Sequence, residues 1–140
     1  MSSGFFGLQT TVAKSVRISG IGVHSGKPAT ITLQPAEADH GIVFERYAGG
    51  RRISAFQAVS DNVGPTALCT VLGEHPGEWI ATIEHVMAAL YAFGVDNLVV
   101  AVEGGEMPIM DGSSRVFVEA LDEAGIVTLP EKRSYRKVTK

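Results

Sequence analysis

The sequence has a single cysteine, little net charge and no long apolar run, and each shortage argues against a class of protein. Cys69 has no second cysteine with which to form an internal disulfide, and the start, MSSGFFGLQTT, lacks the basic segment and apolar core of a secretory signal. We therefore expect a cytoplasmic protein. No apolar run approaches the roughly 20 residues that cross a bilayer, so we expect no transmembrane segment. A net charge of −3 provides no basic face, so we expect no nucleic-acid partner.

The length and the pattern of the first half indicate one domain that begins with short strands. The chain has 140 residues, near the commonest domain size, and 45% of them are hydrophobic. The segments TTVAKSVRISG, ATITLQP, GIVFER and ALCTVLG alternate or are rich in β-branched residues, and turn residues separate them. A glycine-rich stretch between the third and fourth segments predicts a loop with one short strand around Ile53. Antiparallel pairing is the natural arrangement.

Two segments in the second half have the features of helices. Residues Trp79 to Phe93 are too many for an ordinary strand, are rich in Ala, Met and Leu, and end at Gly94. SRVFVEALDEAG forms the second predicted helix, capped by Ser113 or Ser114 and ended by glycine. DNLVVAVEG, between them, reads as a buried strand. This order predicts an α+β two-layer sandwich of a mainly antiparallel sheet with two helices on one face, ribosomal-protein-S5 domain-2-like.

The first predicted helix is apolar on nearly all sides. Its polar positions are Thr82, Glu84, His85 and Tyr91, whereas a surface helix usually has a wide polar face. The sheet covers one side of such a helix, so we expect a second body to cover the other.

Glu84 and His85 are adjacent, and two interpretations of the pair are open. Adjacent helical residues point about 100° apart, so both can border one cavity at the edge of a buried face. In one interpretation they are a solvated acid and a hydrogen-bonded imidazole on the helix rim. In the other His85 is a zinc ligand and Glu84 a base that activates water. The two-histidine HExxH pattern is absent because position 89 is Ala89.

The remaining candidates have both structural and functional interpretations. His24 lies in GIGVHSGKPA, where glycines permit a tight turn that either exposes the imidazole or presents it to a site. His40 and His75 lie in turns and are expected to be solvated. Cys69 is expected in a strand, packed as a small apolar residue. Asp111, in EMPIMDGSS, is expected to form a turn or to cap a helix.

Several uncommon strings occur together in one order. GIGVHSGK, TALCTVL, TIEHVMAALYAFGVDNLVVAVEGGEMPIMDGSS and FVEALDEAGI resemble the amino-terminal domain of UDP-3-O-acyl-N-acetylglucosamine deacetylases, zinc hydrolases of lipid A biosynthesis. The resemblance runs from about residue 10 to the end. It implies that Glu84 is the general base and His85 one of three protein zinc ligands. It also implies that Leu68 and Cys69 line the site and that His24 stands near the substrate.

The resemblance further implies a second domain, with helix layers packed face to face around the active site. The other zinc ligands belong to that domain, and the sequence stops at Lys140, where it would begin. We expect residues 1–128 to form the amino-terminal domain and 129–140 a linker or the start of the next. Alone, the chain is expected to bind zinc poorly, not to deacetylate the UDP-3-O-acyl-glucosamine type of substrate, and to self-associate through its apolar helix face. The alternative is a stand-alone paralogue that acts as a non-catalytic binding or regulatory module.

Overall fold

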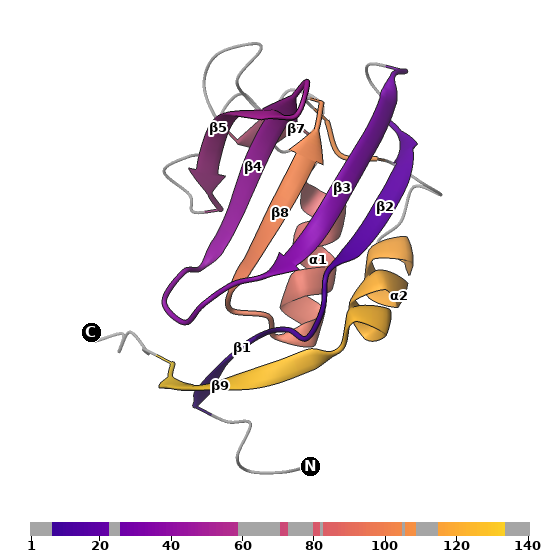
Figure 1. Ribbon diagram of the computed structural model, residues 1–140. Helices are drawn as coiled ribbons and strands as arrows, with labels where there is room; N and C mark the ends of the chain where they lie inside the picture. The colour runs from indigo at the N-terminus through magenta and orange to yellow at the C-terminus, as the bar shows by residue number, and fades with distance from the viewer. Residues whose placement is uncertain are drawn as a thin grey trace, which may run out of the picture.

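The fold is a five-stranded sheet backed by two helices, with a two-stranded ribbon across one end of the sheet (Figure 1). The computed structural model describes residues 7–22, 26–58, 71–72, 80–81, 83–104, 106–108 and 115–133. The elements are, in chain order, β1 (Leu8–Val12), β2 (Val16–Ile21), β3 (Pro28–Pro35), β4 (Ile42–Ala48), β5 (Arg51–Gln57), β6 (Val71–Leu72), β7 (Ile80–Ala81), α1 (Glu84–Phe93), β8 (Leu98–Glu103), α2 (Arg115–Ala124) and β9 (Ile126–Lys132).

The main sheet has the strand order β2-β3-β8-β4-β5. Neighbouring strands are antiparallel except β4 and β8, which run parallel with Phe44 opposite Val100. The chain reaches β8 from β4 through β5, β6, β7 and α1, and this long connection is what a parallel pair requires. The mainly antiparallel two-layer α+β sandwich predicted from the sequence is confirmed.

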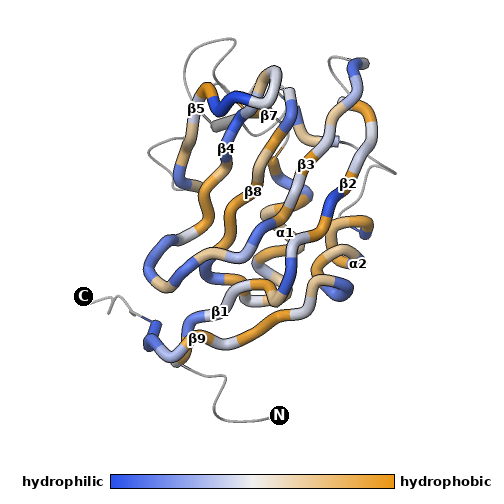
Figure 2. The backbone as a smooth tube through the Cα atoms, in the orientation of Figure 1, coloured by the Kyte–Doolittle hydropathy of each residue, from blue (hydrophilic) through white to orange (hydrophobic). Residues whose placement is uncertain are grey.

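Both helices pack on the same face of the sheet, and the core lies between the two layers (Figure 1). In β8, buried residues alternate with half-buried ones, and the strand is hydrophobic along most of its length (Figure 2). α1 buries residues spaced by three and four positions, the period of a helix face. Among the residues that the structure describes, the largest fully buried side chains are Phe44, Phe117, Ile31, Leu33, Ile80, Leu90, Leu98, Met107, Leu121, Val12 and Val86. Neither helix in the described part of the chain is long and apolar enough to cross a membrane.

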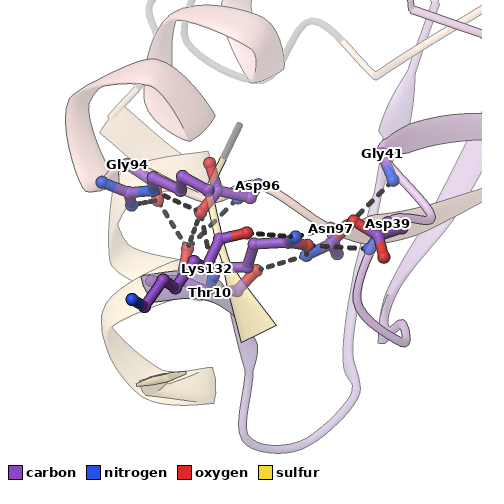
Figure 3. Close-up of polar contacts among 9 residues, drawn as sticks. Thr10, Asp39, Gly41, Gly94, Asp96, Asn97 and Lys132 are labelled. Carbon is purple, nitrogen blue, oxygen red and sulfur yellow. Dashed lines mark hydrogen bonds and ion pairs between the residues drawn. The ribbon is translucent and has the colours of Figure 1, made fainter. Parts of the chain in front are cut away.

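The ribbon is an antiparallel pair of β1 and β9, held to the sheet by buried polar side chains. Asn97, which is 1% exposed, donates from Nδ2 to Gln9 Oε1 at 3.0 Å and accepts at Oδ1 from the Gly41 amide at 2.9 Å. Gln9 Nε2 in turn donates to the Lys132 carbonyl at 3.0 Å and to Asp39 Oδ1 at 2.8 Å (Figure 3). The cluster thus joins both ribbon strands to the start of β8 and to the turn before β4.

The carboxy-terminal ends of both helices were predicted correctly, and some other boundaries were not. α1 ends at Phe93 and is capped by Gly94, which has the left-handed conformation with φ 66°, and α2 is followed by Gly125 with φ 77°. The start of the first helix was predicted too early, because Ile80–Ala81 pair with Val71–Leu72 as strands.

Three strands also differ from the sequence predictions. TTVAKSVRISG is not one strand, since it is divided between β1 and β2, which belong to different sheets. β5 is longer than the short strand expected around Ile53. The strand β9 was not predicted, and it runs to Lys132, past the boundary drawn at residue 128. The division into 1–128 and 129–140 stays a prediction.

Candidate active site

Glu84 and His85 are the first two residues of α1, and both side chains are half-buried. Ile83 precedes the helix without a side-chain cap, and the Met87 amide donates to its carbonyl at 3.0 Å to close the first turn. An acid in the first turn is favoured, because the free amides there carry partial positive charge. The pair therefore lies on the rim of a helix whose inner face, beginning with Val86, is fully buried.

The start of α1 lies at one particular end of the sheet. Only four residues separate the end of α1 from the start of β8, so the helix runs back antiparallel to β8. A helix of ten residues spans about 15 Å and a strand of six about 20 Å. The first turn of α1 is thus placed towards the Glu103 end of β8. Because β4 is parallel to β8, Tyr47 reaches the same end, where the Gly104 amide donates to its carbonyl at 3.2 Å.

Segments next to the other predicted site residues converge on this end. Thr30 of β3 is opposite Glu103 of β8, so the turn from β2 to β3 lies there, and the described part of that turn is closed by the Gly26 amide donating to the Gly22 carbonyl at 2.8 Å. β6 pairs with β7, which leads into α1 two residues later. The fold therefore brings the chain on both sides of His24, and the segment that follows Leu68 and Cys69, to the end of the sheet that holds Glu84.

Most of the other candidates themselves lie outside the described residues: His24, Leu68, Cys69, His75 and Asp111. Their predicted roles are not tested by the structure.

His40 is described and differs from its prediction. It was expected to be solvated, but its side chain is half-buried and its Nε2 is enclosed, without a hydrogen-bond partner among the described residues. It helps to line a shallow hollow of about 560 Å³ with Glu37, Val99 and Leu129. Val99 points away from the helices, because its neighbours in β8 are buried under them. The hollow is therefore separate from the Glu84 site.

The outward side of α1 continues from the Glu84–His85 pair as an exposed apolar stripe, which consists of Ala88, Tyr91 and Ala92. Tyr91 is 91% exposed. Residues 84, 88 and 91 are spaced by four and three positions, and residues 85, 88 and 92 by three and four, so both members of the pair border this stripe. Whatever covers the stripe would also approach the pair.

Two polar groups near this end of the sheet were not singled out from the sequence. Tyr47 donates to Glu45 Oε1 at 2.8 Å, and Glu45 Oε2 pairs with Arg52 at 3.0 Å. The hydrogen bond to Glu45, followed by burial, raises the pKa of Tyr47 above its ordinary value. Arg46 shares the helix-facing side of β4 with Phe44, and burial lowers the pKa of its guanidinium. Charged residues inside a strand pattern give little sequence signal, because strand alternation does not show which end of the sheet they reach.

The described residues do not form a complete metal site. Among them there is no group of three or more His, Cys, Asp or Glu side chains arranged to hold a metal ion. His85 is thus a single candidate donor, and a catalytic zinc ion usually has three protein ligands.

Comparison with known proteins gives matches over most of the chain. Residues 9–140 match the family model LpxC, described as UDP-3-O-acyl N-acetylglycosamine deacetylase. The chain is 46% identical over 132 residues to the UDP-3-O-acyl-N-acetylglucosamine deacetylases of Brucella ovis and Brucella canis, and 45% identical to that of Brucella melitensis. In each case the alignment covers 94% of this chain and 46% of the relative. The chain therefore spans about half the length of the curated relatives it matches.

Proposed function

Because the chain belongs to the UDP-3-O-acyl-N-acetylglucosamine deacetylase family, as its amino-terminal domain, we propose that it supplies the general base and one metal ligand of the deacetylase site. The observation that carries this proposal is the position of Glu84 and His85. They lie together at the start of α1, half-buried, beside an apolar stripe that is open for a second domain. An acid and an imidazole that served only solubility would be expected among polar residues rather than beside this apolar stripe.

In this proposal Glu84 is the catalytic residue of the domain. Deacetylation adds the oxygen of water to the acetamide carbonyl carbon, and the carbon–nitrogen bond then breaks to give acetate and the free amine. A carboxylate beside the attacking water accepts its proton as the new bond forms. Glu84 suits this role, because it is partly shielded from solvent and lies at the positive end of a helix.

His85 is proposed as one ligand of a zinc ion. Bound zinc would polarise the acetamide carbonyl and acidify water, as in other zinc hydrolases. His85 by itself does not make a complete site, so the other donors must come from elsewhere. We therefore expect the isolated chain to bind zinc weakly.

The substrate-side assignments rest on the family resemblance. His24, Leu68 and Cys69 are proposed to contact the UDP-3-O-acyl-N-acetylglucosamine substrate. The described segments that flank them, the β2–β3 turn and β6, support this proposal because they reach the same end of the sheet as the start of α1. The cytoplasmic location also stays a prediction from the sequence.

The test is reconstitution with the part of a relative that the alignment does not cover. The carboxy-terminal half of the Brucella ovis relative, added in trans or fused after Lys140, should give a complex that releases acetate in a metal-dependent way, whereas either half alone should not. Glu84→Gln should abolish the release of acetate while the complex still forms, and His85→Ala should also lower the zinc content. Glu119→Gln is the matched control, because Glu119 is an exposed helical acid on α2.

A non-catalytic binding or regulatory module is the competing proposal. The exposed stripe on α1 would suit a docking surface equally well. A complex that forms fully but releases no acetate with the wild-type domain would favour the module and contradict the catalytic proposal.

A further inference from the structure

The end of β9 is tied to the end of α1 by a compact polar cluster, the Asp96 junction, made of Thr10, Gly94, Asp96 and Arg133 (Figure 3). Arg133 Nε donates to Asp96 Oδ2 at 2.8 Å, and its Nη2 donates to the Gly94 carbonyl at 3.1 Å. The Thr10 amide donates to the same Asp96 oxygen at 2.9 Å. One carboxylate and one helix-terminal carbonyl therefore hold three segments that are far apart in the sequence.

The electrostatics explain why an arginine is needed at this place. The last carbonyls of a helix carry partial negative charge, and Asp96 adds a full negative charge only two residues after Gly94. A guanidinium neutralises both, because its fork of donors reaches a carboxylate and a carbonyl together. The Arg133 and Asp96 side chains are only 26% and 29% exposed, so water screens the pair less than it screens a surface ion pair.

Apart from the Gln9 side chain, which donates to the Lys132 carbonyl, the β1–β9 ribbon has few other sources of rigidity at its β9 end. Most residues of β9 are exposed, so packing contributes little there. A two-stranded ribbon by itself is only marginally stable in water. The Arg133 amide donates to the Gly7 carbonyl at 2.6 Å, which extends the pairing of β9 with β1 by one residue, and the Arg133 side chain then links this end of the ribbon to α1.

We propose that Arg133 is a positioning residue, which fixes the direction in which the chain leaves this domain relative to α1. The effect of this direction on the active site rests on the proposed function. α1 begins with Glu84 and His85, and in the relatives about half of the protein lies outside the aligned segment. A chain held at the far end of α1 would present the next domain to that helix in one orientation. The Asp96 junction would thus preset the geometry of a site shared between two domains.

The experiment measures the position of β9 directly in the 140-residue chain and needs no catalytic activity. Spin labels are attached to cysteines introduced by Glu103→Cys, at the exposed end of β8, and Glu131→Cys, in β9. Cys69→Ser removes the native thiol, and the labelled protein is diluted with unlabelled protein. Pulsed dipolar spectroscopy should give one narrow distance distribution. Arg133→Gln should broaden the distribution or add a second population, and Arg133→Lys should restore part of the narrow one because the charge returns without the fork.

Three further arms keep the proposal refutable. Arg115→Gln removes the arginine of an exposed ion pair on α2, and it should leave the distribution unchanged. If Arg133→Gln unfolds the chain, the unsubstituted protein is measured in concentrated salt, which should weaken the ion pair and broaden the distribution. Asp96→Asn should broaden it as well. If Arg133→Gln and Asp96→Asn fold and the distribution stays narrow in both, the proposal is overturned. If Arg133→Gln does not fold, a distribution of the unsubstituted protein that stays narrow in concentrated salt overturns it. An inactive reconstituted enzyme with the expected distances would count only against the proposed function.

Discussion

Asn97→Ala should destabilise the domain more than its loss of a few atoms suggests. The Asn97 side chain is buried and makes hydrogen bonds to the Gly41 amide at 2.9 Å, to Gln9 Oε1 at 3.0 Å and to the Thr10 carbonyl at 3.3 Å. These bonds connect the β1–β9 ribbon, the start of β8 and the turn before β4. Alanine removes all three and introduces no partner for the groups left behind.

The magnitude follows from which groups lose their last partner. Gln9 Oε1 still accepts from the Asp39 amide at 2.7 Å, and the Thr10 carbonyl still accepts from the Asn97 amide at 3.0 Å. The Gly41 amide has no other partner among the hydrogen bonds of the described residues. Two short hydrogen bonds at about 1 kcal/mol each, plus about 1 kcal/mol for one orphaned amide, give a loss of about 3 kcal/mol. For a domain of this size that is a fall in Tm of roughly 6–12 °C.

Urea denaturation followed by circular dichroism, with a thermal scan, measures this loss. Ser19→Ala is the matched control, because Ser19 forms an exposed side-chain hydrogen bond with Thr30 at 3.1 Å, and its removal should change stability by less than about 0.5 kcal/mol. The m value should be the same in both variants. A loss below about 1 kcal/mol for Asn97→Ala at an unchanged m value would refute the claim that the buried amide holds the ribbon to the sheet.

Three other predictions concern the core, the titration of the sheet and the open helix face. Leu121→Ala should cost about 2–5 kcal/mol in urea denaturation, because Leu121 is fully buried between α2 and the sheet, and a smaller loss would mean that the helix layer repacks. The pKa of Tyr47 is raised by its hydrogen bond to Glu45, so the neutral phenol stabilises the fold below the ordinary pKa of 10.0, and this contribution is lost as pH rises through the raised pKa. The stability difference between wild type and Tyr47→Phe should therefore be constant from pH 8 to 9 and shrink above about pH 10, and a difference independent of pH would contradict the assignment. The isolated chain should self-associate through the α1 stripe, and Tyr91→Lys should shift sedimentation towards monomer, whereas a wild-type monomer at tens of micromolar would count against an interface there.

The sequence by itself determined the fold class, the carboxy-terminal ends of the helices and the adjacency of Glu84 and His85. Helix ends were readable because glycine in the left-handed conformation stops a helix locally, as at Gly94 and Gly125. The strands of the main sheet were readable where one face is buried, since alternation is a local signal. The family resemblance was readable because whole strings of residues agree, and the comparisons bear it out.

Only the tertiary structure decided which segments meet. β9 has mostly exposed residues and no strong alternation, and it is a strand because β1 offers it backbone partners. The predicted start of α1 was wrong because Ile80–Ala81 form a strand paired with β6 instead of helix. The polar cluster around Asn97 and the contact of Arg133 with Asp96 join residues 30 to 123 positions apart. No local pattern records such partners, because a buried amide or a paired arginine depends on groups that only folding brings within hydrogen-bond distance.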